Sequence, residues 1–223
     1  KYGIMAFRPW SLPASLVLLF LGGIVMMLKG TGNMLSLNYI LGFMGTLIGH
    51  SLANGLNTYY DYVNKIDDNT SDDRALFDNY ITIGTLAKVL QVMGATMVAL
   101  FCVVINSLEI NQIYKLLTLA IPLFFITLFY TFNVFSIKYF GKGLSELSIF
   151  LSFGPLLMEC ISVVLSGNYD MDILLLSVPV GLTTVNILHA NNVRDLKTDV
   201  KSNIKSAAYY LDSQNYNFYK FNY

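Results

Sequence analysis

The sequence has 223 residues, of which 55% are hydrophobic and only 13% are charged, and its 14 basic residues balance its 14 acidic ones. A soluble domain of this length carries about twice that charged fraction, so the composition excludes an ordinary soluble globular protein. The apolar residues fall in blocks whose length is near the ~20 residues that a helix needs to cross the hydrocarbon core of a bilayer. We therefore expect a polytopic membrane protein.

Six such blocks follow one another along the chain, and each predicts a membrane-spanning helix. The runs are too long and too uniform for barrel strands, and membrane helices tolerate the Gly and Pro residues within them. In chain order the predicted spans cover about Trp10 to Leu28, Tyr39 to Tyr62, Ile81 to Ile105, Ile113 to Phe132, Leu144 to Leu165 and Ile173 to Leu188. The expected fold is an all-α helical membrane bundle, with one transmembrane domain over residues 1–212 and a polar tail over 213–223.

The end of the second predicted span carries a first polar motif, NTYYDYVNKIDDNTSDDR, which begins at Asn57. Asn57 and Asp61 are one helical turn apart and lie within the apolar segment, where polar groups are costly and usually functional. A solvated acidic loop would explain the carboxylates from Asp67 to Asp78, but not these two residues. An EF-hand is disfavoured, because Asp72 stands at the glycine position of its loop and Asp78 at the glutamate position.

A second polar motif, HANNVRDLKTD, extends the last predicted span beyond His189. Asn191, Asp195 and Asp199 are spaced i, i+4 and i+8, which puts their side chains on one stripe of a helix. The alternative is an ordinary helix extension with paired charges, since Arg194 lies beside this stripe.

The distribution of charge indicates how the two motifs are related. All but Lys29 and Lys115 of the 14 basic residues fall on the face that carries both motifs, so the positive-inside rule puts this face in the cytoplasm. Two acidic clusters on one surface repel each other unless positive charge lies between them. Because Mg²⁺ binds carboxylate oxygens together with substrate phosphates, the residues predict a metal-dependent diphosphate site.

At this point the two motifs resemble those of the UbiA superfamily of intramembrane prenyltransferases, and more narrowly its menaquinone (vitamin K2) branch. There the first motif reads N-x-x-x-D with a further Asp six residues on, and the second reads N-N-x-R-D-x-x-x-D. The matching residues here are Asn57, Asp61 and Asp67, then Asn191, Asn192, Arg194, Asp195 and Asp199. Shorter matches are FRPWSLPASL near the N-terminus, SDDR at 71–74, FYT at 129–131 and FGPL at 153–156.

The resemblance implies a helical bundle around a cavity that opens to lipid. An isoprenyl diphosphate, such as geranylgeranyl diphosphate, would lose its diphosphate there, and a naphthoquinol-type ring would attack the allylic cation. The implied ligands of Mg²⁺ are Asp61, Asp67, Asp195 and Asp199, and the implied catalytic residues are Asp61, Asp195 and Glu146. The implied substrate-binding residues are Arg8, Asn57, Arg74, Tyr130, Lys138, Asn191, Asn192 and Arg194.

Several of these residues keep a second interpretation. The basic ones could be ordinary cytoplasmic anchors. Glu146 stands where the family more often has Asp, and it either orients the acceptor or caps its helix. Glu159 lies well inside the fifth span, where it is protonated, faces the cavity or pairs with a polar neighbour. We expect His189 to be placed near substrate and His50 to be a packing residue.

The family usually has nine helices, whereas six are predicted here, and no apolar run long enough to span follows Asp199. We therefore expect a C-terminally truncated domain that retains both metal motifs. Alternative functions are a ubiquinone- or haem-pathway prenyltransferase and a catalytically inactive membrane adaptor. A transporter is disfavoured, because its acidic residues would lie near the bilayer midplane.

The expected partners are the isoprenyl diphosphate, the aromatic quinol acceptor and the lipid bilayer, with no nucleic acid. The expected location is a multi-pass position in an organelle membrane (endoplasmic reticulum, Golgi or mitochondrion) if the source is eukaryotic.

Overall fold

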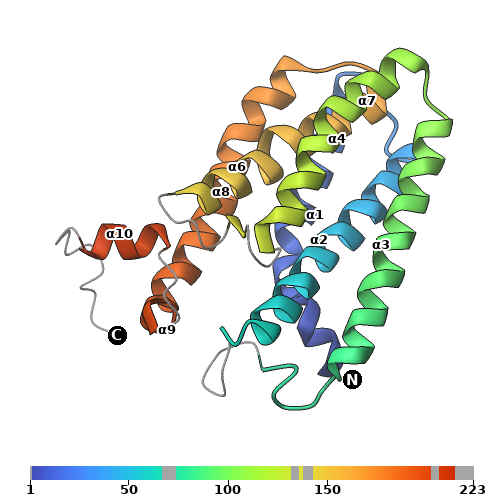
Figure 1. Cartoon of the computed structure of the whole chain (residues 1–223). Helices are drawn as coiled ribbons and strands as arrows, with labels where there is room; N and C mark the ends of the chain where they lie inside the picture. Colours follow the sequence, from blue (N-terminus) through green and yellow to red (C-terminus); the bar gives the residue numbers. More distant parts are fainter. Residues whose placement is uncertain (1, 67–73, 132–135, 138–142, 202–205, 214–223) are drawn as a thin grey trace.

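The computed structural model describes residues 2–66, 74–131, 136–137, 143–201 and 206–213, and every regular element in these ranges is a helix (Figure 1). The long helices are α1 (Pro13–Leu28), α2 (Leu37–Val63), α3 (Ile83–Asn106), α4 (Ile110–Thr131) and α8 (Met171–Arg194). A further long run joins α6 (Leu144–Leu151), η3 (Ser152–Leu156) and α7 (Leu157–Ser166). The short helices are η1 (Tyr2–Phe7), η2 (Pro9–Ser11), α9 (Leu196–Lys201) and α10 (Ala207–Ser213). The predicted all-α fold is confirmed.

Five of the described helical segments are long and apolar enough to cross a membrane. They are Pro9–Leu28, Ile83–Asn106, Ile110–Tyr130, Leu144–Ser166 and Met171–Arg194. The second predicted span, which corresponds to α2, is helical over 27 residues but is not one of these five. The physical reason is its row of polar side chains, His50, Asn54, Asn57 and Asp61. Such side chains face the interior of a helical bundle rather than lipid.

The helices pack into a bundle in which α2 runs along α3, α7 contacts both α1 and α4, and α8 packs against η3 and α6 (Figure 1). One buried apolar cluster joins α1, α2, α7 and α8, and a second joins η1, α2, the segment before α3 and α3 itself. The members of the first are Leu18, Leu19, Met26, Tyr39, Leu157, Met158, Ile161 and Ile173. Close van der Waals packing of this kind is the main attraction between helices in lipid.

The fifth helical run is kinked at η3, a π-helical turn within the FGPL segment. Gly154 has the non-helical angles φ −111° and ψ −108°, and the following Pro155 removes a backbone hydrogen bond from the helix. A Cβ atom on Gly154 would lie 2.9 Å from the carbonyl oxygen of Ser177, and one on Gly181 would lie 3.0 Å from that of Phe150. The absence of side chains at these two glycines therefore lets the backbones of α8 and η3 approach closely.

Ion pairs and a helix cap connect the elements at the end of the bundle away from the two Asp-rich motifs. Lys29 Nζ lies 2.6 Å from Asp170 Oδ2 and 2.7 Å from Asp172 Oδ2. The Asp170 side chain also accepts hydrogen bonds from the N–H groups of Asp172 and Ile173 at the start of α8. Glu159 is 4% exposed, and its Oε2 accepts a hydrogen bond from the Asp170 N–H at 3.1 Å. Of the interpretations of Glu159, pairing with a polar neighbour is therefore the one observed.

Candidate active site

The last turns of α2 carry the first motif into the protein interior. Asn57 is 5% exposed and Asp61 is 2% exposed. Asn57 Nδ2 donates a hydrogen bond to Asp61 Oδ2 at 2.8 Å, as their spacing of one helical turn allows. The amide therefore orients a carboxylate that is almost fully withdrawn from solvent.

Glu146 lies in the first turn of α6 and connects this helix to the second motif. Its Oε1 accepts a hydrogen bond from Asn192 Nδ2 at 3.1 Å, and its Oε2 accepts one from the Ser145 hydroxyl at 2.7 Å. His189 Nδ1 lies 4.0 Å from Glu146 Oε1, so the histidine that precedes the motif faces the same carboxylate. Glu146 therefore does more than cap its own helix, because it holds two side chains of α8.

Tyr130, next to the end of α4, relates the two motifs to each other. Its phenol interacts electrostatically with Glu146, Arg8 and Asp61. These three residues belong to α6, to the segment between η1 and η2, and to α2. Four of the predicted site residues, from parts of the chain that are distant in sequence, therefore lie near one another at one end of the bundle.

The second motif crosses the junction between α8 and α9, and Asp195 is the C-cap of α8. The helical spacing continues through the junction, since the Asp195 N–H donates to the Asn191 carbonyl at 2.9 Å and the Asp199 N–H donates to the Asp195 carbonyl at 2.9 Å. Arg194 Nε and Nη2 donate to Asp195 Oδ1 and Oδ2 at 2.8 and 2.9 Å. The helical spacing of Asn191, Asp195 and Asp199 is therefore observed, and so is the charge pairing with Arg194 that an ordinary helix extension would also show.

Three of the remaining predicted substrate contacts, Arg74, Asn191 and Arg194, are exposed. Arg74 is exposed and forms an i, i+4 ion pair with Asp78, with 2.8 Å between Nη2 and Oδ1. Asn191 is exposed as well, and the Arg194 side chain is 56% exposed. Lys138 lies outside the described residues.

The carboxylates of the two motifs are suitable ligands for Mg²⁺, which prefers oxygen donors from carboxylates and water. In the part of the chain that the structure describes, however, no three His, Cys, Asp or Glu side chains come together closely enough to hold a metal ion. Asp67, a predicted ligand, lies outside that part. The assignment of Asp61, Asp67, Asp195 and Asp199 to Mg²⁺ therefore stays a prediction.

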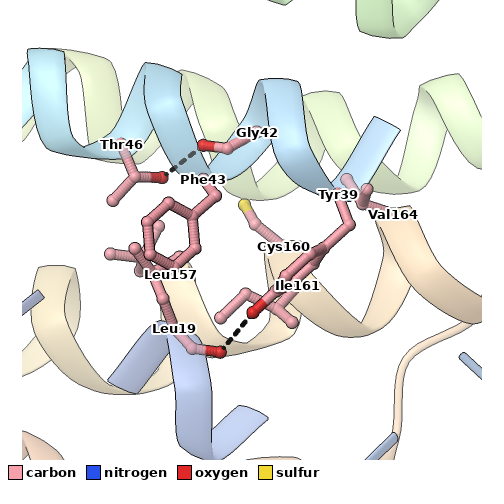
Figure 2. Close-up of a pocket in the computed structure, with 9 residues that line it drawn as sticks. All are labelled: Leu19, Tyr39, Gly42, Phe43, Thr46, Leu157, Cys160, Ile161 and Val164. Atoms are coloured by element: carbon pink, nitrogen blue, oxygen red, sulfur yellow. Dashed lines mark hydrogen bonds between the residues drawn. The ribbon is translucent and has the colours of Figure 1, made fainter. Parts of the chain in front are cut away.

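A separate, small apolar pocket lies between α1, α2 and α7. Figure 2 shows its lining, including the Tyr39 hydroxyl, which donates to the Leu19 carbonyl oxygen at 2.7 Å. The lining residues are Leu19, Tyr39, Gly42, Phe43, Thr46, Leu157, Cys160, Ile161 and Val164. The sequence analysis missed this pocket, although 39, 42, 43 and 46 in α2, and 157, 160, 161 and 164 in α7, follow the i, i+3, i+4, i+7 pattern of one helix face.

Comparison with known proteins adds a family relationship to this geometry. Residues 15–219 match the model of the UbiA prenyltransferase family. The "UbiA prenyltransferase domain-containing protein 1" of Xenopus tropicalis is 32% identical over 208 residues, which is 92% of this chain and 58% of that protein. The proteins of the same name from Danio rerio and Homo sapiens are 32% and 31% identical, over 93% and 92% of this chain and 60% and 59% of their own lengths. The chain thus spans less than two thirds of the length of these relatives.

Proposed function

The chain belongs to the UbiA prenyltransferase family, and from this premise we propose that it transfers an isoprenyl group from an isoprenyl diphosphate to an aromatic quinol acceptor. The observation that supports this most directly is that Asp61, Glu146 and Arg8 all lie within electrostatic range of Tyr130. A diphosphate substrate needs positive charge at the membrane surface, and its isoprenyl tail needs apolar surroundings. Basic residues are present at this end of the bundle, and the adjoining helices are long and apolar enough to cross a membrane.

The two Asp-rich motifs together would bind the diphosphate end of the substrate. Asp61, Asp67, Asp195 and Asp199 would hold Mg²⁺, which would neutralise the charge that develops on the leaving diphosphate. Asn57 keeps the Asp61 carboxylate in position through its 2.8 Å hydrogen bond.

Basic residues would complete the diphosphate contacts. Arg8 lies within electrostatic range of Tyr130, whereas Arg74 and Arg194 are exposed and each is already paired with a carboxylate. Lys138 has the same proposed role, on the basis of the motif alone. These residues also support a cytoplasmic position for this end of the bundle, by the positive-inside rule.

The acceptor ring would lie beside Glu146 and Tyr130. Glu146 is held by Asn192 and Ser145 and is close to His189, so a fixed carboxylate is available to orient a quinol hydroxyl. The surrounding apolar helices would keep water from the allylic cation, and aromatic faces would stabilise it. The NNVRD and SDDR sequences support a naphthoquinol acceptor and a role in menaquinone (vitamin K2) biosynthesis rather than the ubiquinone or haem pathway.

Prenyl transfer in purified membranes tests this proposal, with geranylgeranyl diphosphate and a naphthoquinol as substrates and mass spectrometry of the product. The protein should be expressed with any further sequence that its gene encodes. We expect product with Mg²⁺, none with EDTA, and a large loss in Asp61→Ala and Asp195→Ala. Asp172→Asn is the matched control, because it removes a carboxylate at the opposite end of the bundle.

The outcomes separate the possible functions. Mg²⁺-dependent product that is lost in both site variants, but not in the control, supports the transferase and its metal site together. Product with a benzenoid acceptor alone would move the assignment to the ubiquinone pathway. A folded protein with no transfer to any acceptor would contradict the catalytic proposal and favour a binding role.

A further inference from the structure

A second polar stripe runs along α2 beside the one that carries Asn57 and Asp61. His50, Asn54 and Thr58 are spaced i, i+4 and i+8, so they share one face of the helix. The sequence predicts a packing role for His50, and neither Asn54 nor Thr58 is one of the predicted site residues. Nothing in the proposed chemistry requires these residues to touch substrate.

Asn54 and Thr58 of this stripe are hydrogen-bonded to the backbone of the N-terminal segment. The Thr58 hydroxyl donates to the Ala6 carbonyl oxygen at 3.0 Å, and Asn54 Nδ2 donates to the Phe7 carbonyl oxygen at 3.1 Å. Because the acceptors are main-chain atoms, these bonds fix the path of the segment rather than the rotamer of one side chain.

Ser11 extends the same network to the next carbonyl. Its hydroxyl donates to the Arg8 carbonyl oxygen at 2.8 Å and accepts from Asn54 Nδ2 at 2.8 Å. It also lies 3.2 Å from His50 Nε2, while the Ser15 hydroxyl lies 2.7 Å from His50 Nδ1. Both ring nitrogens of His50 are therefore bonded, and three successive backbone carbonyls, at positions 6, 7 and 8, receive side-chain hydrogen bonds.

Arg8 itself has an unusual backbone conformation at the centre of this network. Its φ of 47° and ψ of 59° are left-handed, a conformation that residues with a Cβ atom rarely adopt because it is sterically costly. Such conformations persist only where the surrounding structure holds them, and they are concentrated at functional sites. The left-handed residue is the same arginine that interacts with Tyr130 at the candidate active site.

We propose that Asn54, supported by His50 and Thr58, is a positioning residue that holds Arg8 in its left-handed conformation, so that its guanidinium meets the diphosphate of the isoprenyl donor. The inference rests on the proposed function and adds a part that no motif assigns. It explains why α2 has two polar stripes: one carries the first Asp-rich motif, and the other fixes the backbone at Arg8.

An apolar contact keeps this proposal testable, because it attaches the N-terminal segment to α2 independently of the hydrogen bonds. Ala6 is fully buried, and Phe7 packs at Gly55 so closely that a Cβ atom there would lie 2.9 Å from Phe7 Cε1. Removing a hydrogen bond from the stripe should therefore shift Arg8 without releasing the segment. Variants of Asn54 are expected to fold.

The test compares Asn54→Leu, Thr58→Val and Arg8→Ala in the prenyl-transfer assay, with KM and kcat measured for each substrate. The loss of hydrogen bonds that position a charged group predicts a decrease of roughly tenfold in kcat/KM for the diphosphate in Asn54→Leu. A smaller decrease is expected in Thr58→Val, and KM for the acceptor should be unchanged in both. Thr96→Val is the matched control, since the Thr96 hydroxyl bonds only within α3, to the Val92 carbonyl at 2.9 Å.

The double variant Arg8→Ala/Asn54→Leu decides whether Asn54 acts through Arg8. If it does, the double variant is no less active than Arg8→Ala alone, because interacting residues give non-additive effects. Additive losses, or an Asn54→Leu variant that behaves like Thr96→Val, would overturn the proposal. An equal rise in KM for both substrates would also overturn it, since that is the effect of a general packing defect.

Failure of the proposed function gives a different pattern. If the unmodified protein transfers no isoprenyl group, binding of inorganic diphosphate in the presence of Mg²⁺, measured by calorimetry, takes the place of the kinetic assay. Weaker binding in Asn54→Leu that is not additive with Arg8→Ala would keep the positioning role. Unchanged binding in Asn54→Leu would reject that role as well.

Discussion

The two ends of the helical bundle hold their charged side chains in different ways. At the end away from the Asp-rich motifs, Lys29 pairs with Asp170 and Asp172, and Lys115 Nζ donates to Asn168 Oδ1 at 2.6 Å. The hydrogen bond between Lys29 and Asp170 lowers the pKa of the Asp170 carboxyl and raises the pKa of the lysine. These charges neutralise one another and connect the loop after α1 to the start of α8.

At the other end, neutral groups donate to Asp61 and Glu146, while Arg194 pairs with Asp195. Asn57 donates to Asp61, and Asn192 and Ser145 donate to Glu146. A neutral donor fixes the position of a carboxylate without cancelling its charge, whereas an ion pair cancels it. We therefore expect the pairs at the first end to contribute mainly to stability, and Asp61 and Glu146 to contribute mainly to the proposed binding of substrate.

Exchanging Asp for Asn at each end provides the strongest test of this comparison. Asp61→Asn keeps an acceptor oxygen but removes the charge, so prenyl transfer should fall by roughly a hundredfold to a thousandfold, while the unfolding temperature changes little. Asp170→Asn should lower the unfolding temperature by roughly 2–4 °C and leave the activity per folded molecule unchanged. Thermal unfolding in detergent and the transfer assay measure both. A stable, fully active Asp61→Asn variant would contradict the division between the ends.

Two glutamates of the fifth helical run, the half-buried Glu146 and the buried Glu159, allow a second, smaller test. Glu146→Gln should reduce prenyl transfer by roughly tenfold to a hundredfold, because a charged hydrogen-bonding group is lost from the acceptor site. Glu159→Gln retains an oxygen that can accept from the Asp170 N–H, so activity and stability should both stay close to those of the unmodified protein. Equal loss of activity in the two variants, measured at saturating acceptor, would contradict a specific role of Glu146 in binding the acceptor.

Much of the fold follows directly from the sequence. Long apolar blocks predict the helices within a few residues, because a helix that crosses lipid must satisfy its own backbone. The one block that differs is α2, whose polar stripes reduce its apolar character even though it is as long as its neighbours. The contact of Asn57 with Asp61 was also predictable, since it depends only on spacing along one helix.

Contacts between distant elements were not predictable in this way. The spacing of residues does not indicate that Tyr130 of α4 meets Arg8, or that Asn192 of α8 reaches Glu146 of α6, because these contacts depend on how the helices pack. Nor does it indicate the left-handed conformation of Arg8, which depends on hydrogen bonds from α2. The metal assignment depends in addition on Asp67, which lies outside the described residues.

The close approach of α8 and η3 lies between the two ends and tests whether both depend on the same packing. Gly181→Ala should destabilise the protein by about 1–3 kcal/mol, because the added methyl group would meet the Phe150 carbonyl. Since α8 carries Asn192, prenyl transfer should fall as well. Gly84→Ala in α3 is the matched control, because a Cβ atom there meets nothing within 4 Å. Lower stability with unchanged activity would mean that the site does not depend on this contact.

The smallest expected effect is a pH dependence confined to the charge-paired end. Because the pKa of Asp170 is lowered in the folded protein, its pair contributes stability above the unfolded value of about 3.9, and this contribution is lost as the pH falls through the lowered folded pKa. Because the pKa of Lys29 is raised, the contribution of the lysine is complete below about 10.4 and is lost only above that value. The difference in unfolding temperature between the unmodified protein and Lys29→Met should therefore be constant near neutral pH and shrink in acid. It should be small throughout, since exposed ion pairs contribute little. A difference that stayed constant into acid would mean that Lys29 stabilises this end by packing rather than by charge.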